Sequence, residues 1–174
     1  MSNIEIVQEL RQLNMKFDGT DICAMDLAYD VAHKYSSCRL CGVGKGVGAL
    51  IVRNGIILSF GYNGMVAGIR PCTAKTCIRL TREPAYGTGR DECYGDCAEK
   101  RAFLNAYQTR TDITGAKIYI TKSPCISCCK LILNLGLQEV IFDKVYAESE
   151  FSFELLDMAS VPWRKIKGFT RADH

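Results

Sequence analysis

The sequence is short of histidine and of excess charge. Two of its 174 residues are histidines, His33 and His174, and neither lies near the cysteine motifs. The formal net charge is only +3, from 22 Lys and Arg against 19 Asp and Glu. Such a mild excess does not predict a nucleic-acid groove, so we expect no nucleic-acid partner, whereas a small anionic substrate is compatible with it.

Long hydrophobic runs are also missing. The opening stretch MSNIEIVQELRQLNMKF interleaves charged and apolar residues, so it predicts neither a signal peptide nor a membrane span. We therefore expect a cytoplasmic protein with no membrane partner. Because thiols stay reduced in that compartment, the ten cysteines predict metal ligands and buried thiols rather than disulfides.

The composition is that of one globular domain. Hydrophobic residues make up 48% of the chain, and it has no internal repeat or low-complexity tract, which predicts a single domain over residues 1–174. Apolar residues at three- and four-residue intervals predict amphipathic helices over residues 4–17 and 22–35. Ser2 and Asp21 are the expected N-caps.

Two short β-rich runs follow these helices. Residues 47–53 and 56–61 flank Asn54-Gly55, a dipeptide that favours a type I′ turn, so they predict a hairpin. Residues 65–96 then lose all periodicity and form a cysteine-rich loop insertion. A loop of this length is unusual in a compact domain unless a metal or a function holds it.

The rest of the chain alternates between helix and strand. This order predicts an α/β fold, a three-layer α/β/α sandwich around a mixed sheet of about five strands. Gly136 is expected to end one of the helices. The predicted helices are residues 97–109, 125–135 and 150–158, and the predicted strands are residues 117–121, 139–142 and 161–166.

The stretches GDCAEKRAF and SPCISCCK carry the chemistry. Catalytic zinc takes three protein ligands and keeps a fourth position open, and Cys97, Cys125 and Cys128 make three. Each motif lies at the start of a predicted helix, whose partial positive charge favours thiolates. A purely structural zinc site and a coincidental thiol cluster are the alternatives, and Cys129 is read as a buried bystander.

Glu99 follows the first of these cysteines by two residues. A carboxylate there can take a proton from a water on the metal and deliver it to a leaving group. Three thiolates make zinc a weaker Lewis acid than a ligand set with one imidazole does, so neighbouring cations should matter for its activity. Lys100 and Arg101 are the nearest candidates for balancing this charge.

The paired motifs resemble the signature of the zinc-dependent deaminases, in which H-x-E or C-x-E precedes P-C-x-x-C. Within that superfamily, residues 26–165 resemble the deoxycytidylate (dCMP) deaminase family. The resemblance implies a cytidine deaminase-like fold and zinc-dependent hydrolysis of dCMP to dUMP and ammonia, a step of pyrimidine metabolism toward dTMP. It is carried by SSCR, VGALIV, GYNG, AGIRPC and YITKSPCISC.

The resemblance also implies roles for residues that would contact the nucleotide. Asn63 would contact the sugar, and the backbone of Ala98 would hold the base. Arg39 and Lys45 are candidates for the phosphate, with solvated surface charges as the alternative reading. For Asn63 the alternative is a turn residue that tolerates positive φ.

Two positions depart from the dCMP deaminase pattern HAExNA. Cys97 replaces its histidine, and Arg101 stands where asparagine is usual. CAEKRAF is closer to the CAERTA of small cytidine deaminases, whose three-cysteine zinc is balanced by an arginine. Deamination of cytidine, deoxycytidine, CMP or dCTP is therefore an alternative function. A nucleic-acid-editing deaminase and a non-enzymatic zinc module are weaker alternatives.

A second group of cysteines lies outside the catalytic motif. Some dCMP deaminases carry a second, structural zinc in the loop before the catalytic helix, and this resemblance implies a site of four cysteines with Cys41 as a substitute. Free thiols are the alternative. Family members are commonly homo-oligomers, and some are regulated allosterically by dCTP and dTTP. The four expected ligands are Cys38, Cys72, Cys77 and Cys93.

Overall fold

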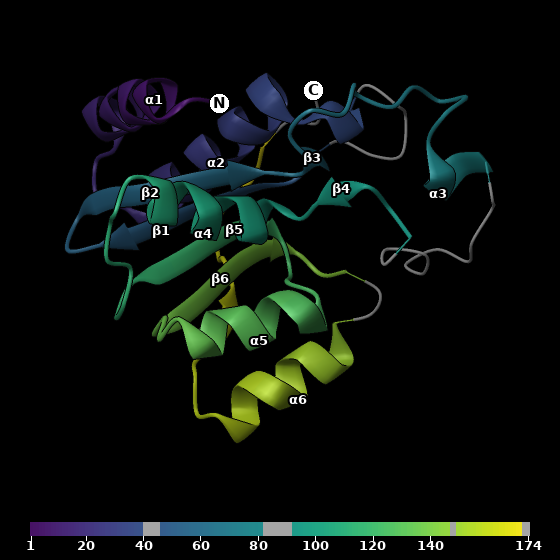
Figure 1. The fold of residues 1–174 in the computed structure, drawn as a ribbon. Coiled ribbons are helices and arrows are strands. Elements are labelled where there is room, and N and C mark those ends of the chain that lie inside the picture. Colours follow the sequence, from purple (N-terminus) through teal and green to yellow (C-terminus); the bar gives the residue numbers. More distant parts are fainter. Residues whose placement is uncertain (40–45, 82–91, 147–148, 172–174) are drawn as a thin grey trace.

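A five-stranded mixed sheet forms the middle layer of the fold (Figure 1). The computed structural model describes residues 1–39, 46–81, 92–146 and 149–171. The strand order is β2-β1-β5-β6-β7; β1 is antiparallel to β2 and β5, while β6 is parallel to β5 and β7. The predicted mixed sheet is confirmed. Its strands are β1 (Gly48–Arg53), β2 (Ile56–Tyr62), β5 (Lys117–Lys122), β6 (Glu139–Lys144) and β7 (Trp163–Lys165).

Helices cover both faces of this sheet, which confirms the three-layer sandwich. Alternate side chains of a strand point to opposite faces. Leu50 and Tyr119 accordingly pack under α1 (Asn3–Lys16) and α2 (Asp21–Tyr35), whereas Ala49 and Ile118 pack under helices of the other face. Those helices are α4 (Ala98–Gln108), α5 (Ile126–Asn134) and α6 (Glu150–Met158).

The first helix starts as expected, and the second differs by one residue. Ser2 caps α1 in a capping box with Glu5. Thr20 rather than Asp21 caps α2, because its hydroxyl accepts a hydrogen bond from the backbone N–H of Cys23 at 3.1 Å. Asp21 is the first helical residue, and its carboxylate contacts Arg164 instead. No helix in the described segments is long and apolar enough to cross a membrane.

The predicted hairpin is formed by β1 and β2. Asn54 and Gly55 have φ values of 53° and 74°, as a type I′ turn requires. β2 is an edge strand, and the side chain of Asn14 covers part of that edge. Its amide donates to the carbonyl of Ile57 and accepts from the N–H of the same residue, both at 2.9 Å. This contact occupies backbone groups that an edge strand otherwise exposes.

The cysteine-rich loop contains short regular elements that its sequence did not predict. β3 (Gly64–Met65) and β4 (Gly95–Asp96) pair antiparallel at its two ends, and α3 (Ile78–Thr81) lies between them. The loop therefore begins and ends at one place, directly before the helix that carries the C-x-E motif. Residues 82–91 lie outside the described part of the chain.

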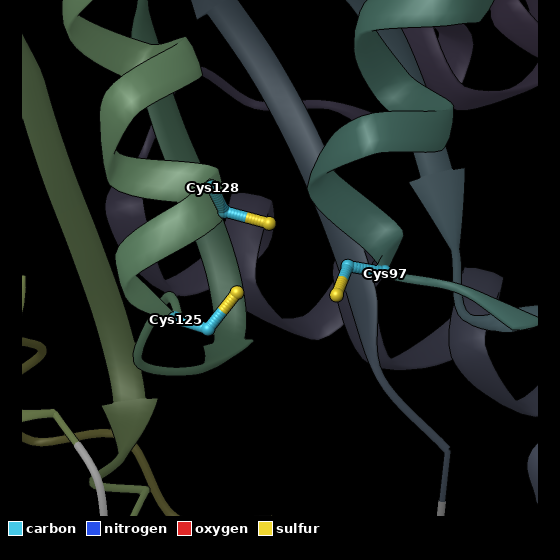
Figure 2. Close-up of side chains that lie close together, drawn as sticks. All are labelled: Cys97, Cys125 and Cys128. Carbon is cyan, nitrogen blue, oxygen red and sulfur yellow. The ribbon is translucent and has the colours of Figure 1, made fainter. Parts of the chain in front are cut away.

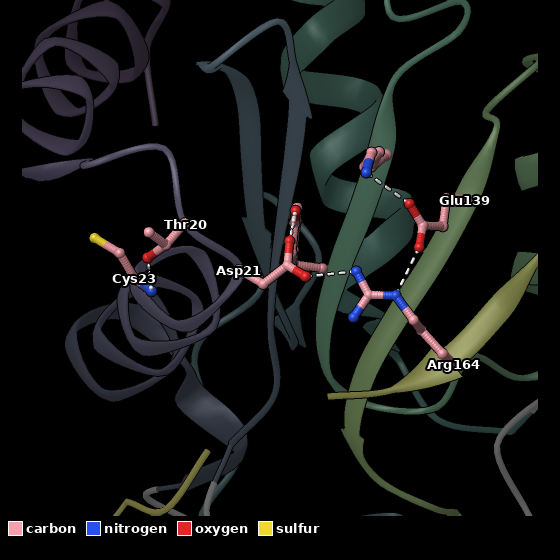
Figure 3. A network of polar contacts seen from close by, with 7 residues as sticks. Thr20, Asp21, Cys23, Glu139 and Arg164 are labelled. Carbon is pink, nitrogen blue, oxygen red and sulfur yellow. Dashed lines mark hydrogen bonds and ion pairs between the residues drawn. The ribbon is translucent and has the colours of Figure 1, made fainter. Parts of the chain in front are cut away.

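A charged cluster joins α2 to the sheet at the N-terminal ends of β5 and β6 (Figure 3). The guanidinium of Arg164 donates to the carboxylates of Asp21 and Glu139, and the Lys117 ammonium contacts Glu139 at 2.8 Å. The hydroxyl of Tyr119 donates to Asp21 at 2.6 Å. Each carboxylate thus faces a cation.

Candidate active site

Helix α4 lies unusually close to strand β2. A Cβ atom on Gly61 would come within 2.1 Å of the carbonyl oxygen of Ala98 and within 2.3 Å of the backbone nitrogen of Ala102. Only glycine permits this approach without moving the helix. The first turn of α4 is therefore held directly over the sheet.

Two buried hydrogen bonds fix the same helix further along. Ser59 donates its hydroxyl to the carbonyl of Ala102 at 2.6 Å, and Asn105 donates its amide to the carbonyl of Phe60 at 2.8 Å. Both bonds run between β2 and α4. They set the rotation of the helix and thus the direction of its first side chains.

Cys97 and Cys125 occupy equivalent places at the starts of two helices. Each is the N-cap residue, of α4 and α5 respectively, with extended backbone and no capping bond from its thiol. The turn before Cys125 is held by Ser123, whose N–H donates to the carbonyl of Lys144 at 2.8 Å. Both thiols therefore lie beside the positive ends of helix dipoles.

The three predicted thiols converge (Figure 2). The sulfur atoms of Cys97, Cys125 and Cys128 all lie within 4.8 Å of one another. Sulfurs around tetrahedral zinc sit at about 2.3 Å from the ion and hence about 3.8 Å apart, so small side-chain adjustments accommodate it. This donor set fits zinc.

The electrostatics of the cluster favour a bound cation. Contact with Cys125 raises the pKa of Cys97, as do burial and Glu99, although contact with Cys128 acts in the opposite direction. The pKa of Cys128 is raised by its contacts with Cys125 and Cys97, then by burial and Glu99. Neighbouring thiols resist ionising together, and a divalent cation among them would stabilise the thiolates.

Glu99 is the second residue of α4 and is only 4% exposed. It follows Cys97 by two residues, and its charge contributes to raising the pKa of Cys97, Cys128 and Cys129. Cys129 is itself fully buried in the core on that side of the sheet, as the reading of a bystander requires. A buried carboxylate next to a metal site is suited to proton transfer.

The structure describes some of the residues expected to bind the nucleotide. Ala98 is its first residue and is fully buried. Arg39 is exposed at the end of the 3₁₀ helix η1 (Ser37–Arg39), whereas Lys45 falls outside the described residues. Their contacts with a nucleotide stay predictions.

Asn63 has a structural role that its sequence context did not indicate. Its Oδ1 accepts from the hydroxyl of Ser36 at 2.6 Å and from the N–H of Val47 at 2.7 Å. The alternative reading of a positive-φ turn residue is wrong, because the described non-glycine residues with positive φ are others. With Oδ1 occupied, the amide nitrogen is the end of this side chain suited to donate to a ligand.

The two candidate charge-balancing residues lie differently. Arg101 donates to the carbonyls of Gly64 and Met65, and its guanidinium stacks over the ring of Tyr62. Lys100 is half-buried on the same turn of α4. Balancing of the thiolate charge by either residue stays a prediction.

The second cysteine group is not assembled in the same way. Among the described residues, the trio of Cys97, Cys125 and Cys128 is the only set of three or more potential ligands whose atoms all lie within 4.8 Å. The four cysteines expected to bind a second zinc therefore do not form such a set. Cys41 lies outside the described segments. A second zinc stays a prediction. The four are Cys38, Cys72, Cys77 and Cys93.

Sequence reasoning missed the residues that place the site rather than form it. Ser36, Ser59 and Asn105 each make one contact across the fold. A single polar residue in a strand or helix has no periodic signal that reveals such a partner. Gly61 did carry a signal, since glycine within a strand indicates close approach of another backbone.

Comparison with known proteins identifies relatives across most of the chain. Residues 19–144 match the family described as "Cytidine and deoxycytidylate deaminase zinc-binding region". The chain is 32% identical to ComE operon protein 2 of Bacillus subtilis, over 70% of this chain and 60% of that protein. It is 36% identical to deoxycytidylate deaminase of Homo sapiens, over 69% of this chain and 67% of that protein.

Solved structures share the fold. A cyanophage dCMP deaminase in complex with dCMP and dUMP aligns with a TM-score of 0.62 at 25% identity, covering 81% of this chain and 95% of that one. The match to deoxycytidylate deaminase of Schizosaccharomyces pombe, at 30% identity over 81% of this chain, spans only 42% of that protein. The chain thus matches about half the length of some of its curated relatives.

Proposed function

The chain belongs to the cytidine and deoxycytidylate deaminase zinc-binding family, and on that premise we propose that it hydrolyses dCMP to dUMP and ammonia. The observation that carries the proposal is the convergence of three thiols beside a buried carboxylate. The sulfurs of Cys97, Cys125 and Cys128 lie within 4.8 Å of one another, and Glu99 is 4% exposed. Relatives that act on dCMP support this choice of substrate.

The protein groups divide the reaction between them. Cys97, Cys125 and Cys128 would hold the zinc, which when bound would lower the pKa of water and so supply a nucleophile at neutral pH. A C4–O bond forms and the C4–N bond breaks. Glu99 moves one proton of the water to N3 and the other to the departing amine, so it ends the cycle as it began.

The same site offers groups for the rest of the nucleotide. The backbone of Ala98 lies at the positive end of α4 and holds the base, while the amide nitrogen of Asn63 donates to the sugar. Arg39 and Lys45 are the proposed phosphate ligands. A second zinc, allosteric control by dCTP and dTTP, assembly as a homo-oligomer and a cytoplasmic location also belong to this proposal as predictions.

A substrate panel tests the assignment. Zinc-loaded protein is incubated with cytidine, CMP, dCMP and dCTP, and loss of the cytosine absorbance is followed. We expect the highest kcat/KM with dCMP. Preference for the unphosphorylated nucleoside would assign the chain to cytidine deamination instead. If none of the four compounds is turned over, the proposal that the chain is a deaminase is wrong.

Glu99→Gln tests the proton shuttle separately from metal binding. The amide keeps the shape of the side chain but cannot transfer protons, so we expect kcat to fall by about 10²- to 10⁴-fold. Zinc content, measured by elemental analysis, should stay at the wild-type level. A variant that keeps both its zinc and its rate would exclude Glu99 from the chemistry.

A further inference from the structure

The root of the cysteine-rich loop is a very short ribbon. β3 and β4 pair in the register Gly64–Asp96 and Met65–Gly95. Even a full two-stranded hairpin is only marginally stable by itself, and this one has two residues in each strand. Contacts from outside the ribbon must therefore hold it in place.

Arg101 supplies such contacts from the first turn of the catalytic helix. Its Nη2 atom donates to the carbonyl of Met65 at 2.7 Å and to that of Gly64 at 3.2 Å. The centre of the guanidinium lies 4.6 Å from the centre of the Tyr62 ring. Charge-assisted hydrogen bonds and stacking on an aromatic face are both stronger for arginine than for a neutral donor.

A second set of contacts comes from the η1 segment and its neighbours. The N–H of Met65 donates to the hydroxyl of Ser37 at 3.1 Å. The residue before β3 is Asn63, whose Oδ1 accepts from Ser36 and from the N–H of Val47. β3 therefore contacts both the η1 segment and α4, and Arg101 provides the contact to α4.

These contacts close a circuit that includes a predicted zinc ligand. From Gly64 it crosses to Asp96 by strand pairing, continues along the chain to Cys97, follows α4 to Arg101 and returns to Gly64. In the part of the chain that is described, both hydrogen bonds of the Arg101 guanidinium go to β3 carbonyls. The sequence had suggested instead that this guanidinium balances the thiolates.

We infer that Arg101 is a positioning residue that clamps β3 to α4 and thereby sets Asn63 relative to Cys97 and Glu99. The catalytic group and the proposed sugar donor come from different segments, and this clamp fixes their separation. The expected effect on the kinetics of deamination rests on the proposed function. The clamp itself does not, because it concerns the order of the ribbon.

Hydrogen exchange of the zinc-loaded protein tests the clamp directly. The N–H of Met65 donates to the hydroxyl of Ser37, and the N–H of Val66 donates to the carbonyl of Tyr94. In Arg101→Gln we expect both amides to exchange about tenfold faster, the equivalent of one charge-assisted hydrogen bond. Arg110→Gln makes the same chemical change at an exposed position just beyond α4 and should leave both rates unchanged.

Kinetics and zinc affinity distinguish a positioning role of Arg101 from charge balancing and from a purely structural contact. We expect KM for dCMP to rise about tenfold in Arg101→Gln, with kcat within about threefold of the wild type, because Asn63 loses its alignment. Zinc affinity, measured by competition with a chromogenic chelator, should change less than KM. Arg101→Lys keeps the charge without the planar fork, so it should show wild-type zinc affinity and intermediate exchange.

Two results would overturn the inference, and a third would overturn only the proposed function. If Met65 and Val66 exchange at the wild-type rate in Arg101→Gln, Arg101 does not clamp the ribbon. Weaker zinc binding in that variant would then establish charge balancing. Faster exchange with an unchanged KM shows a contact that is structural only. If the wild type does not deaminate dCMP, the proposed function fails, while the exchange rates still decide whether the clamp exists; KM is then read with the cytosine substrate that is turned over.

Discussion

The two ends of strand β5 carry polar clusters that are built in opposite ways. At its N-terminal end, Asp21 and Glu139 each contact a cation, and Arg164 contacts both. Burial opposes the ionisation of each carboxylate, but hydrogen bonds from Tyr119 and Arg164, and from Lys117 and Arg164, outweigh it, so both pKa values are lowered. The charges of this cluster stabilise one another within the protein.

The C-terminal end of β5 leads into a cluster of groups that become negative. Cys97 and Cys128 have raised pKa values because they lie against other thiols, are buried and are near Glu99. On the proposed function, a bound metal would supply the positive charge that this cluster lacks. On the proposed function, the first cluster therefore serves folding and the second serves metal binding and chemistry.

Removing one thiol of the metal cluster should have the largest effect. Cys128→Ala takes away one of three ligands, so we expect the zinc content to fall toward zero and activity to drop more than about a hundredfold. Cys129→Ala is the matched control, because this neighbouring thiol packs in the core. It should lose stability but keep zinc. Equal zinc loss in both variants would contradict the assignment of ligands.

Alanine at two glycines compares the faces of the sheet. A Cβ on Gly61 would meet the backbone of α4 at 2.1 Å, and one on Gly48 would meet the carbonyl of Ala28 in α2 at 1.9 Å. We expect both variants to lose about 1–3 kcal/mol of unfolding free energy, as overpacked sites do. Only Gly61→Ala moves the helix that carries Cys97, so only it should also lose zinc affinity. Urea denaturation and chelator competition measure the two effects.

Arg164→Gln should have the smallest effect, confined to stability. Its ion pair with Asp21 joins side chains that are 40% and 35% exposed, so after solvent screening we expect a loss of about 1 kcal/mol at pH 7. The lowered pKa values of Asp21 and Glu139 mean that the stabilisation is present above their unfolded values, about 3.9 and 4.3. It disappears as the pH falls through the lower folded values.

The difference between wild type and Arg164→Gln should therefore shrink as the pH is lowered from 7 toward 3. Urea denaturation followed by circular dichroism at several pH values measures it. Deamination kinetics at neutral pH should not change, because this cluster lies at the other end of β5. A difference that persists undiminished at pH 3, or a loss of activity, would contradict the separation of the two clusters.

Local patterns predicted those parts of the fold that depend on neighbours in sequence. Asn54-Gly55 indicated its turn because both residues tolerate positive φ. The cysteine motifs predicted a shared metal site because each lies at a helix start, and the structure brings their sulfurs together. The N-cap of α2 was misassigned because Thr20 and Asp21 are both good caps. The carboxylate of Asp21 accepts a hydrogen bond from Arg164, which is far away in sequence, and does not cap the helix.

By itself the sequence determined the three-layer fold and indicated Cys97, Cys125, Cys128 and the adjacent Glu99 as the candidate site, because periodicity and motif spacing are local properties. Only the tertiary structure decided that Arg101 contacts the carbonyls of β3 and that Gly61 admits α4 against the sheet. Such contacts join residues 35 or more positions apart. Their partners depend on how the layers pack, which no local pattern specifies.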